Sequence, residues 1–269
     1  MPLDVTILGS GTCVPSLARA SACALVACGR ERLVLDMGCG AVHRLVAAGQ
    51  PLAEVTHLLL THFHPDHTGD LAAFLFANQY PQPLRREPLT LVGGPGVRGF
   101  FEALKGAWGR WIDLGERMFQ IVEVGGPGRI ATGEAFALEA APMTHNPESL
   151  AYRVTALDDG ACMVYSGDTD ACQSLEDLAR GADLFICEAA LPEALRAAGH
   201  LTPLRAGRIA ARAGVGRLVL THLYPVCEAA DPQVECRAAW SGPLDVAHDL
   251  MRFHVAPGGR GAAVQRGDG

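Results

Sequence analysis

The segment LTHFHPDHTGD, residues 60–70, places three histidines and two aspartates directly after an apolar run. The run LLLT ahead of the first histidine is typical of a buried strand, so these polar groups lie where that strand ends. Alternate side chains of an extended segment point to the same side, so His62 and His64 can bind one metal ion together. Pro65 then turns the chain, which directs Asp66 and His67 towards a second ion. Imidazole and carboxylate suit zinc and related metals, so the segment predicts a metal site.

Three further candidate ligands stand alone at the ends of other predicted strands. They are His145 in APMTHNPE, Asp168 in VYSGDTD and His222 in LVLTHLYP. The four groups of the first segment leave two ions incompletely coordinated, so residues from distant strands are needed. The sequence thus predicts one shared site to which several strand ends contribute.

Apolar runs of strand length recur along the chain, and helical patterns separate groups of them. Helices are expected over 41–49, 68–80, 96–108, 171–181 and 202–214. Many strands with helices between sub-groups favour an α/β sandwich over an alternating doubly wound sheet. No linker or low-complexity segment divides the chain, so we expect a single domain over 1–269.

Composition narrows the class of protein further. Apolar residues make up 49% of the chain and charged residues 19%, which is typical of a folded globular protein. No apolar run approaches the roughly 20 residues of a membrane span. The N-terminus MPLDVTILGSG has no basic leader region, so a cytoplasmic location is expected. The net charge of −7 argues against a broad nucleic-acid-binding face. The nine cysteines include no CxxC pair and are expected to be buried, reduced thiols.

The motif H-x-H-x-D-H is followed by an isolated His, by the Asp of an SGDT turn and by a last His after an apolar strand. This order of residues resembles the metal-binding motifs of the metallo-β-lactamase superfamily. The resemblance covers nearly the whole chain and implies a four-layer αββα sandwich with a metal site at one edge of the packed sheets. It implies two divalent ions, with zinc expected first and manganese or iron as alternatives. It assigns the ligands in this order: His62, His64 and His145 to the first ion, Asp66, His67 and His222 to the second, and Asp168 as the bridge.

Within this superfamily, three segments resemble the ribonuclease Z-like branch: ILGSGTCVPSLARASACALV, LVLDMGCG and CEAALPEALRAAGHLTPLRAG. In that branch a Glu, and a His before Ser or Thr, shape the catalytic pocket, and these positions match Glu188 and His200. Two features depart from ribonuclease Z itself. MGCGAVHRL follows Asp36 where Glu-Gly-Thr-Gln is expected. The long basic arm that grips transfer RNA has no counterpart, since VGGPGRIATG (124–133) is short and carries one Arg.

These observations predict a dinuclear metal-dependent hydrolase, with a small anionic phosphodiester as the first substrate hypothesis. A metal-bridging hydroxide would attack in line with the leaving oxygen. Asp66, Glu188 and His200 are the predicted catalytic residues, with His200 stabilising the phosphoryl oxygens or protonating the leaving alkoxide. Asp36, Asp70 and Glu188 are predicted to orient ligand imidazoles.

Several alternatives stay open. The first is ribonuclease Z-like 3′ processing of transfer RNA, and the second is hydrolysis of a lactone, thioester or sulfate ester at the same site. A non-catalytic metal-binding module is the third, and the complete set of ligand positions argues against it. A homodimer is expected by analogy with relatives, nucleic acid is the less favoured partner, and no membrane partner is expected. Trp108 and Trp111 are expected to be core or dimer contacts. Four other histidines are expected in the core or on the surface: His43, His57, His248 and His254.

Overall fold

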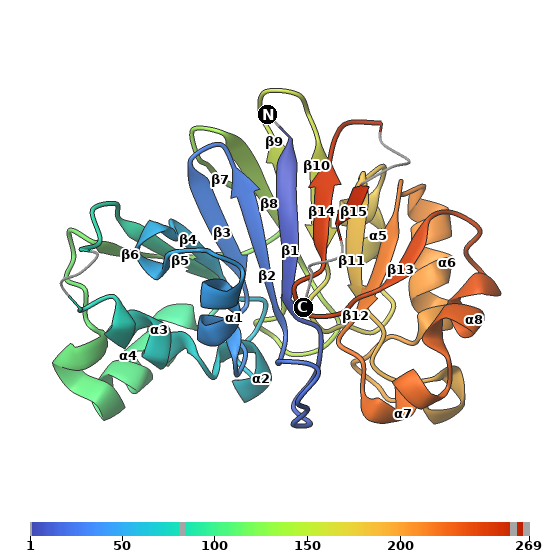
Figure 1. Cartoon of the computed structure of the whole chain (residues 1–269), viewed down its shortest axis with the longest axis horizontal. Helices are drawn as coiled ribbons and strands as arrows, with labels where there is room; N and C mark the ends of the chain where they lie inside the picture. The colour runs from blue at the N-terminus through green and yellow to red at the C-terminus, as the bar shows by residue number, and fades with distance from the viewer. Residues whose placement is uncertain (1, 81–83, 259–262, 266–269) are drawn as a thin grey trace.

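The computed structural model describes residues 2–80, 84–258 and 263–265, which form two β-sheets packed face to face (Figure 1). Within these residues the first sheet has eight strands, in the spatial order β15 (Ala263–Gln265), β14 (Arg252–Val255), β1 (Leu3–Gly9), β2 (Cys23–Cys28), β3 (Glu31–Leu35), β4 (His57–Leu59), β5 (Leu89–Gly93) and β6 (Phe119–Glu123). The second has seven, in the order β13 (Leu244–Val246), β12 (Leu218–Thr221), β11 (Leu184–Glu188), β10 (Cys162–Tyr165), β9 (Leu150–Ala156), β8 (Phe136–Pro142) and β7 (Gly128–Thr132).

Helices cover the outer face of each sheet (Figure 1). The first sheet carries α1 (Ala41–Ala47), α3 (Leu71–Ala77) and α4 (Val97–Trp108), and the second carries α5 (Gln173–Ala179), α6 (Pro203–Ala213) and α8 (Pro232–Arg237). The connections contain short helices, which are α2 (Pro65–Thr68), α7 (Pro225–Ala229), η1 (Leu52–Glu54), η2 (Gly109–Ile112) and η3 (Glu193–Leu195). No helix in the described part of the chain is both long and apolar enough to cross a membrane. This arrangement is a four-layer αββα sandwich, which confirms the predicted fold class.

Three apolar layers hold the sandwich together. Phe136 and Tyr152 are fully buried between the two sheets. Phe74 is buried between the first sheet and its helices, and Phe185 between the second sheet and its helices. Each such side chain contributes about 1.5–3 kcal/mol by leaving water. Because both faces of each sheet are covered, strands such as β11 and β12 are buried at every position and appear in the sequence as continuous apolar runs.

The direction of the strands decides where the site forms. Strands β3 to β6 run parallel in the first sheet, and β10 to β13 run parallel in the second. The carboxyl ends of parallel strands lie at one edge of a sheet. The segments that follow β4, β10 and β12, together with the last residue of β11, therefore come together at one edge of the sandwich.

Within the helix predicted over 68–80 the structure forms the shorter α3, Leu71–Ala77, which Gly69 and Asp70 separate from α2. The Asp70 carboxylate accepts hydrogen bonds from the backbone N–H groups of Gly40 and Val42, at 3.1 and 3.0 Å. This tie to the start of α1 fixes the chain at Asp70 and interrupts the helical pattern. The apolar pattern that predicted this helix depends on neighbouring residues. The interruption depends on hydrogen bonds to residues about 30 positions earlier in the chain.

Two cysteines expected to be buried are exposed, and so are two tryptophans expected in the core or at a dimer contact. Cys13 and Cys39 are exposed, although six of the other cysteines are buried as expected. Trp108 and Trp111 are 55% and 54% exposed, so neither is a core residue. Their predicted role in dimer contacts stays a prediction.

Candidate metal centre

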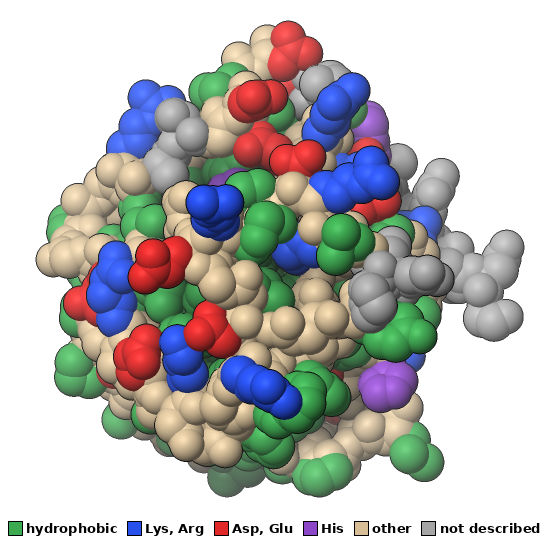
Figure 2. All heavy atoms as spheres, turned by 90° about the vertical axis from the view of Figure 1, so that its left-hand side faces the viewer, with side chains coloured by type: hydrophobic (Ala, Val, Ile, Leu, Met, Phe, Trp, Pro, Cys, Tyr) green, Lys and Arg blue, Asp and Glu red, His purple; other side chains and the backbone are tan. Residues whose placement is uncertain are grey.

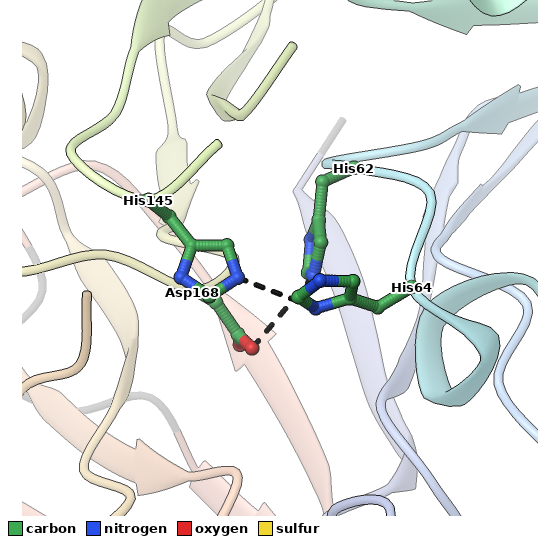
Figure 3. A group of neighbouring side chains, drawn as sticks. All are labelled: His62, His64, His145 and Asp168. Atoms are coloured by element: carbon green, nitrogen blue, oxygen red, sulfur yellow. Dashed lines mark hydrogen bonds and ion pairs between the residues drawn. The ribbon is translucent and has the colours of Figure 1, made fainter. Parts of the chain in front are cut away.

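Side chains from both sheets meet at this edge, and Figure 3 shows four of them. His62 and His64 follow β4, whereas His145 follows β8 and Asp168 follows β10. Nδ1 of His64 lies 3.3 Å from Nε2 of His145, and Nε2 of His62 lies 3.8 Å from Oδ2 of Asp168. One potential ligand atom of each residue lies within 4.8 Å of those of the other three. We call His62, His64 and His145 the first donor group, and Asp168 lies beside them.

The second donor group comprises Asp66, His67 and His222, whose potential ligand atoms also lie within 4.8 Å of one another. Nε2 of His222 lies 3.4 Å from Nε2 of His67 and 3.4 Å from Oδ2 of Asp66. Pro65 occupies the first position of α2, between His64 and Asp66. The chain therefore turns between the two donor groups as the sequence predicted.

Asp168 lies between the two donor groups. Its Oδ2 faces His62, whereas its Oδ1 lies 3.4 Å from Nε2 of His67 and 3.5 Å from Nε2 of His222. Burial opposes ionisation, but the charges of His222 and His67 hold the pKa of Asp168 well below its usual value. One buried carboxylate thus presents an oxygen to each group.

Unpaired buried atoms test whether these residues fit a metal ion. Nε2 of His62 and Oδ1 of Asp168 are buried without a hydrogen-bond partner. Leaving such a group unsatisfied costs about 1–3 kcal/mol. Burial, with the neighbouring His67, lowers the pKa of His62 to about 2, so its imidazole is neutral and can donate a lone pair. Neutral imidazole and carboxylate are the ligands of zinc and similar divalent ions, so the donor set fits divalent metal.

Asp36 supports the second donor group, as the sequence predicted. Nδ1–H of His67 donates to its Oδ2 at 2.8 Å, and the backbone N–H of Thr61 donates to its Oδ1 at 2.8 Å. This bond turns Nε2 of His67 towards Asp168. Asp36 is fully buried and has a φ of 61°, a conformation that costs a residue with a side chain about 1–3 kcal/mol. The same prediction for Asp70 is wrong, because that carboxylate binds the backbone of α1.

Asp36→Asn is expected to weaken metal affinity by about 10- to 100-fold, the usual effect of losing a partner of a ligand imidazole. The amide can no longer accept from both Thr61 and His67, since one of its two ends carries only donors. Metal titration against a chromophoric chelator measures the change. Asp70→Asn is the matched control and should retain the wild-type affinity. An equal loss in both variants would contradict the assignment of Asp36.

Glu188 and His200 form a hydrogen-bonded pair beside the donor groups. Glu188 ends β11 and is 1% exposed, and its Oε1 accepts from Nδ1–H of His200 at 3.2 Å. Burial raises the pKa of Glu188. Burial also disfavours the charged form of His200, which is the protonated one, but the hydrogen bond and the charge of Glu188 raise the pKa of His200 to about 9. Thr202 caps α6 and Pro203 begins it, so His200 is held at the helix entrance.

Two residues that the sequence analysis did not identify orient histidines of the first donor group. The backbone carbonyl of Gly199 accepts from Nδ1–H of His145 at 2.9 Å, and the side-chain amide of Asn146 lies 3.1 Å from Nε2 of His64. In each ring the other nitrogen faces the centre. Gly199 has a φ of 82°, and a Cβ at this position would lie 3.0 Å from Nδ1 of His145. Of the two, only Asn146 could have been identified from the sequence, because it directly follows the predicted ligand His145.

Comparison with known proteins gives consistent results. Residues 31–223 match the family model described as the Beta-lactamase superfamily domain. A ribonuclease Z of Mycobacterium sp. (strain KMS) is 32% identical over 281 residues, covering 95% of this chain and 97% of the relative. Among solved structures, the metallo-beta-lactamase fold protein YhfI from Bacillus subtilis matches with a TM-score of 0.82 and 24% identity, covering 94% of this chain and 100% of that one. The short form of human tRNase Z matches with a TM-score of 0.74 and 23% identity, covering 93% of this chain and 98% of that one.

Proposed function

Since this chain belongs to the beta-lactamase superfamily and is a metal-dependent hydrolase, we propose that it cleaves phosphodiester bonds in RNA in the manner of ribonuclease Z. The curated relatives support this substrate, because proteins named ribonuclease Z align with this chain along almost their whole length. The sequence alone favours a small phosphodiester as the first substrate hypothesis and transfer RNA processing as the second. The comparisons favour the reverse order.

In this proposal the two donor groups hold two divalent ions, with zinc favoured by the nitrogen and oxygen ligands. His62, His64 and His145 bind the first ion and Asp66, His67 and His222 the second. The position of Asp168, with one oxygen towards each group, is the observation that carries the proposal. When bound, the ions would supply Lewis-acid activation of water near neutral pH and compensate the negative charge of the phosphodiester.

The protein's own side chains have separate tasks in this reaction. Asp66 contributes a second carboxylate at the site, and although burial opposes its ionisation, the hydrogen bond from His222 lowers its pKa to about 2. Glu188 holds Nδ1 of His200, which fixes the orientation of the ring and keeps it protonated. The remaining N–H of His200 can then donate to a phosphoryl oxygen or transfer its proton to the leaving alkoxide.

A small phosphodiester is the second candidate substrate, because the described part of the chain has no long basic arm at the position where ribonuclease Z is expected to carry one. Residues 124–133, which the sequence analysis compared with the RNA-binding arm, form only strand β7 and the short turns beside it. On the face shown in Figure 2, basic side chains are interspersed with acidic and apolar ones and form no continuous band. Phosphate contacts from Lys and Arg usually supply most of the affinity for nucleic acid.

A substrate panel on one zinc-loaded preparation separates these candidates. It contains a precursor transfer RNA with a 3′ trailer, methyl 4-nitrophenyl phosphate, a thioester and a lactone. We expect cleavage of the RNA and slower cleavage of the aryl phosphodiester, with both activities lost on chelation. Cleavage of the aryl phosphodiester alone would favour the second candidate. Cleavage of only the thioester or lactone would contradict phosphodiester hydrolysis altogether.

A further inference from the structure

The connection between β1 and β2, residues 10–22, forms one wall of a cavity beside the metal centre. In the view of Figure 1 this loop extends below the sheets, between α2 and α7. The cavity has a volume of about 670 Å³, and its opposite wall is made by α1 together with Pro65 and Asp66. Because Asp66 also belongs to the second donor group, the cavity adjoins the proposed reaction centre. Its volume lies in the usual range for small-molecule sites, about 300–1,000 Å³.

Hydrogen bonds fix the base of the loop, so this wall of the cavity has its shape before a ligand binds. Asp249 accepts hydrogen bonds from the backbone N–H groups of Ser10 and Ala20, at 3.0 and 2.7 Å. At the other end of the cavity opening, Cys13 Sγ lies 3.3 Å from the hydroxyl of Tyr224. These contacts join the loop to segments more than 200 residues away in the chain.

The lining combines exposed apolar side chains with one free imidazole. Val14 is 38% exposed and Leu17 is fully exposed, although both are apolar. The two arginines of the lining are already paired, Arg19 with Glu228 and Arg44 with Asp249. The imidazole of His43, an exposed residue of α1, has no hydrogen bond or ion pair among the described residues. A ligand would therefore meet an uncovered apolar wall on one side and an unpaired hydrogen-bond donor on the other.

We propose that this cavity binds the nucleotide next to the scissile phosphate. The base or ribose packs against Val14, Pro15 and Leu17, and the flanking phosphate accepts a hydrogen bond from His43. Burial of the apolar wall by a planar base removes it from water, and the phosphate gives the exposed His43 imidazole a hydrogen-bond partner. This subsite rests on the proposed function, since a nucleotide reaches the cavity only if its neighbouring phosphodiester lies at the donor groups.

Two surface variants test the subsite, Leu17→Ser and His43→Ala. The measurement is the ratio of kcat/KM for the RNA substrate to kcat/KM for methyl 4-nitrophenyl phosphate, which has neither a base nor a second phosphate. We expect this ratio to fall about tenfold in each variant, the effect of losing one good contact. Leu157→Ser and His254→Ala, which remove an exposed leucine and histidine outside the cavity, are the matched controls and should keep the wild-type ratio.

The outcomes distinguish the subsite from the proposed function. If wild-type protein cleaves neither substrate, phosphodiester hydrolysis itself is wrong. If wild-type protein cleaves both and the ratio in Leu17→Ser and His43→Ala equals that of the controls, the subsite is wrong while the proposed function stands.

Discussion

Asp168→Ala is expected to lower kcat for phosphodiester cleavage by more than about 10³-fold, because removing even one hydrogen-bond donor to a developing charge costs about 10²–10³. The loss should exceed that of a single hydrogen bond, because one oxygen of the Asp168 carboxylate faces each of the two donor groups. Its loss also removes the carboxylate that lies among four buried or half-buried histidines. Metal content by inductively coupled plasma mass spectrometry should fall together with kcat.

Asp177→Ala is the control for this variant. Asp177 lies on the exposed face of α5, where it pairs with Arg180, so metal content and kcat should match those of the wild type. Full metal content in Asp168→Ala with an unchanged kcat would contradict the assignment of the two donor groups.

His200→Ala is expected to lower kcat by about 10²- to 10⁴-fold, the usual contribution of a general acid or base. Metal content should stay at the wild-type level, because the proposed ligands remain in place. The variant leaves Glu188 buried without its partner, so a thermal melt should accompany the assay to confirm folding. Loss of metal would identify His200 as a ligand instead, since its Nδ1 lies 3.9 Å from Oδ2 of Asp168.

Glu188→Gln extends this test, because Glu188 is proposed to act through His200. The amide removes the negative charge that raises the pKa of His200, so kcat should fall, though by less than in His200→Ala. The double variant should be no slower than His200→Ala alone, as expected for two residues that act as one unit. Additive losses would mean that the two side chains act separately.

The sequence predicted those parts of the site that depend on neighbouring residues. The order of His62, His64 and Asp66 around Pro65 follows from strand alternation and from the turn that proline imposes, and both are local effects. The helices over 96–108 and 202–214 were also predicted within two residues, because each buries a regular apolar face against a sheet.

Predictions failed where a distant segment decided the outcome. Asp70 has the residue type of an imidazole partner, but the backbone of α1 lies closer to it. Of the two roles expected for Trp108, the core position is wrong, because the side chain is 55% exposed among the described residues. Cys13 is exposed because the loop that carries it extends beyond both sheets.

By itself, the sequence determined which residues could bind metal, since the residue types and their positions after apolar strands are properties of the chain. Only the tertiary structure decided which of them meet, because His62, His145 and Asp168 come together through the packing of two sheets whose parallel strands end at one edge. It also decided which nitrogen of His67 and of His145 faces the centre. That choice depends on hydrogen bonds to Asp36 and Gly199, and the bonded residues lie 31 and 54 positions apart in the chain, a distance over which local sequence carries no geometric information.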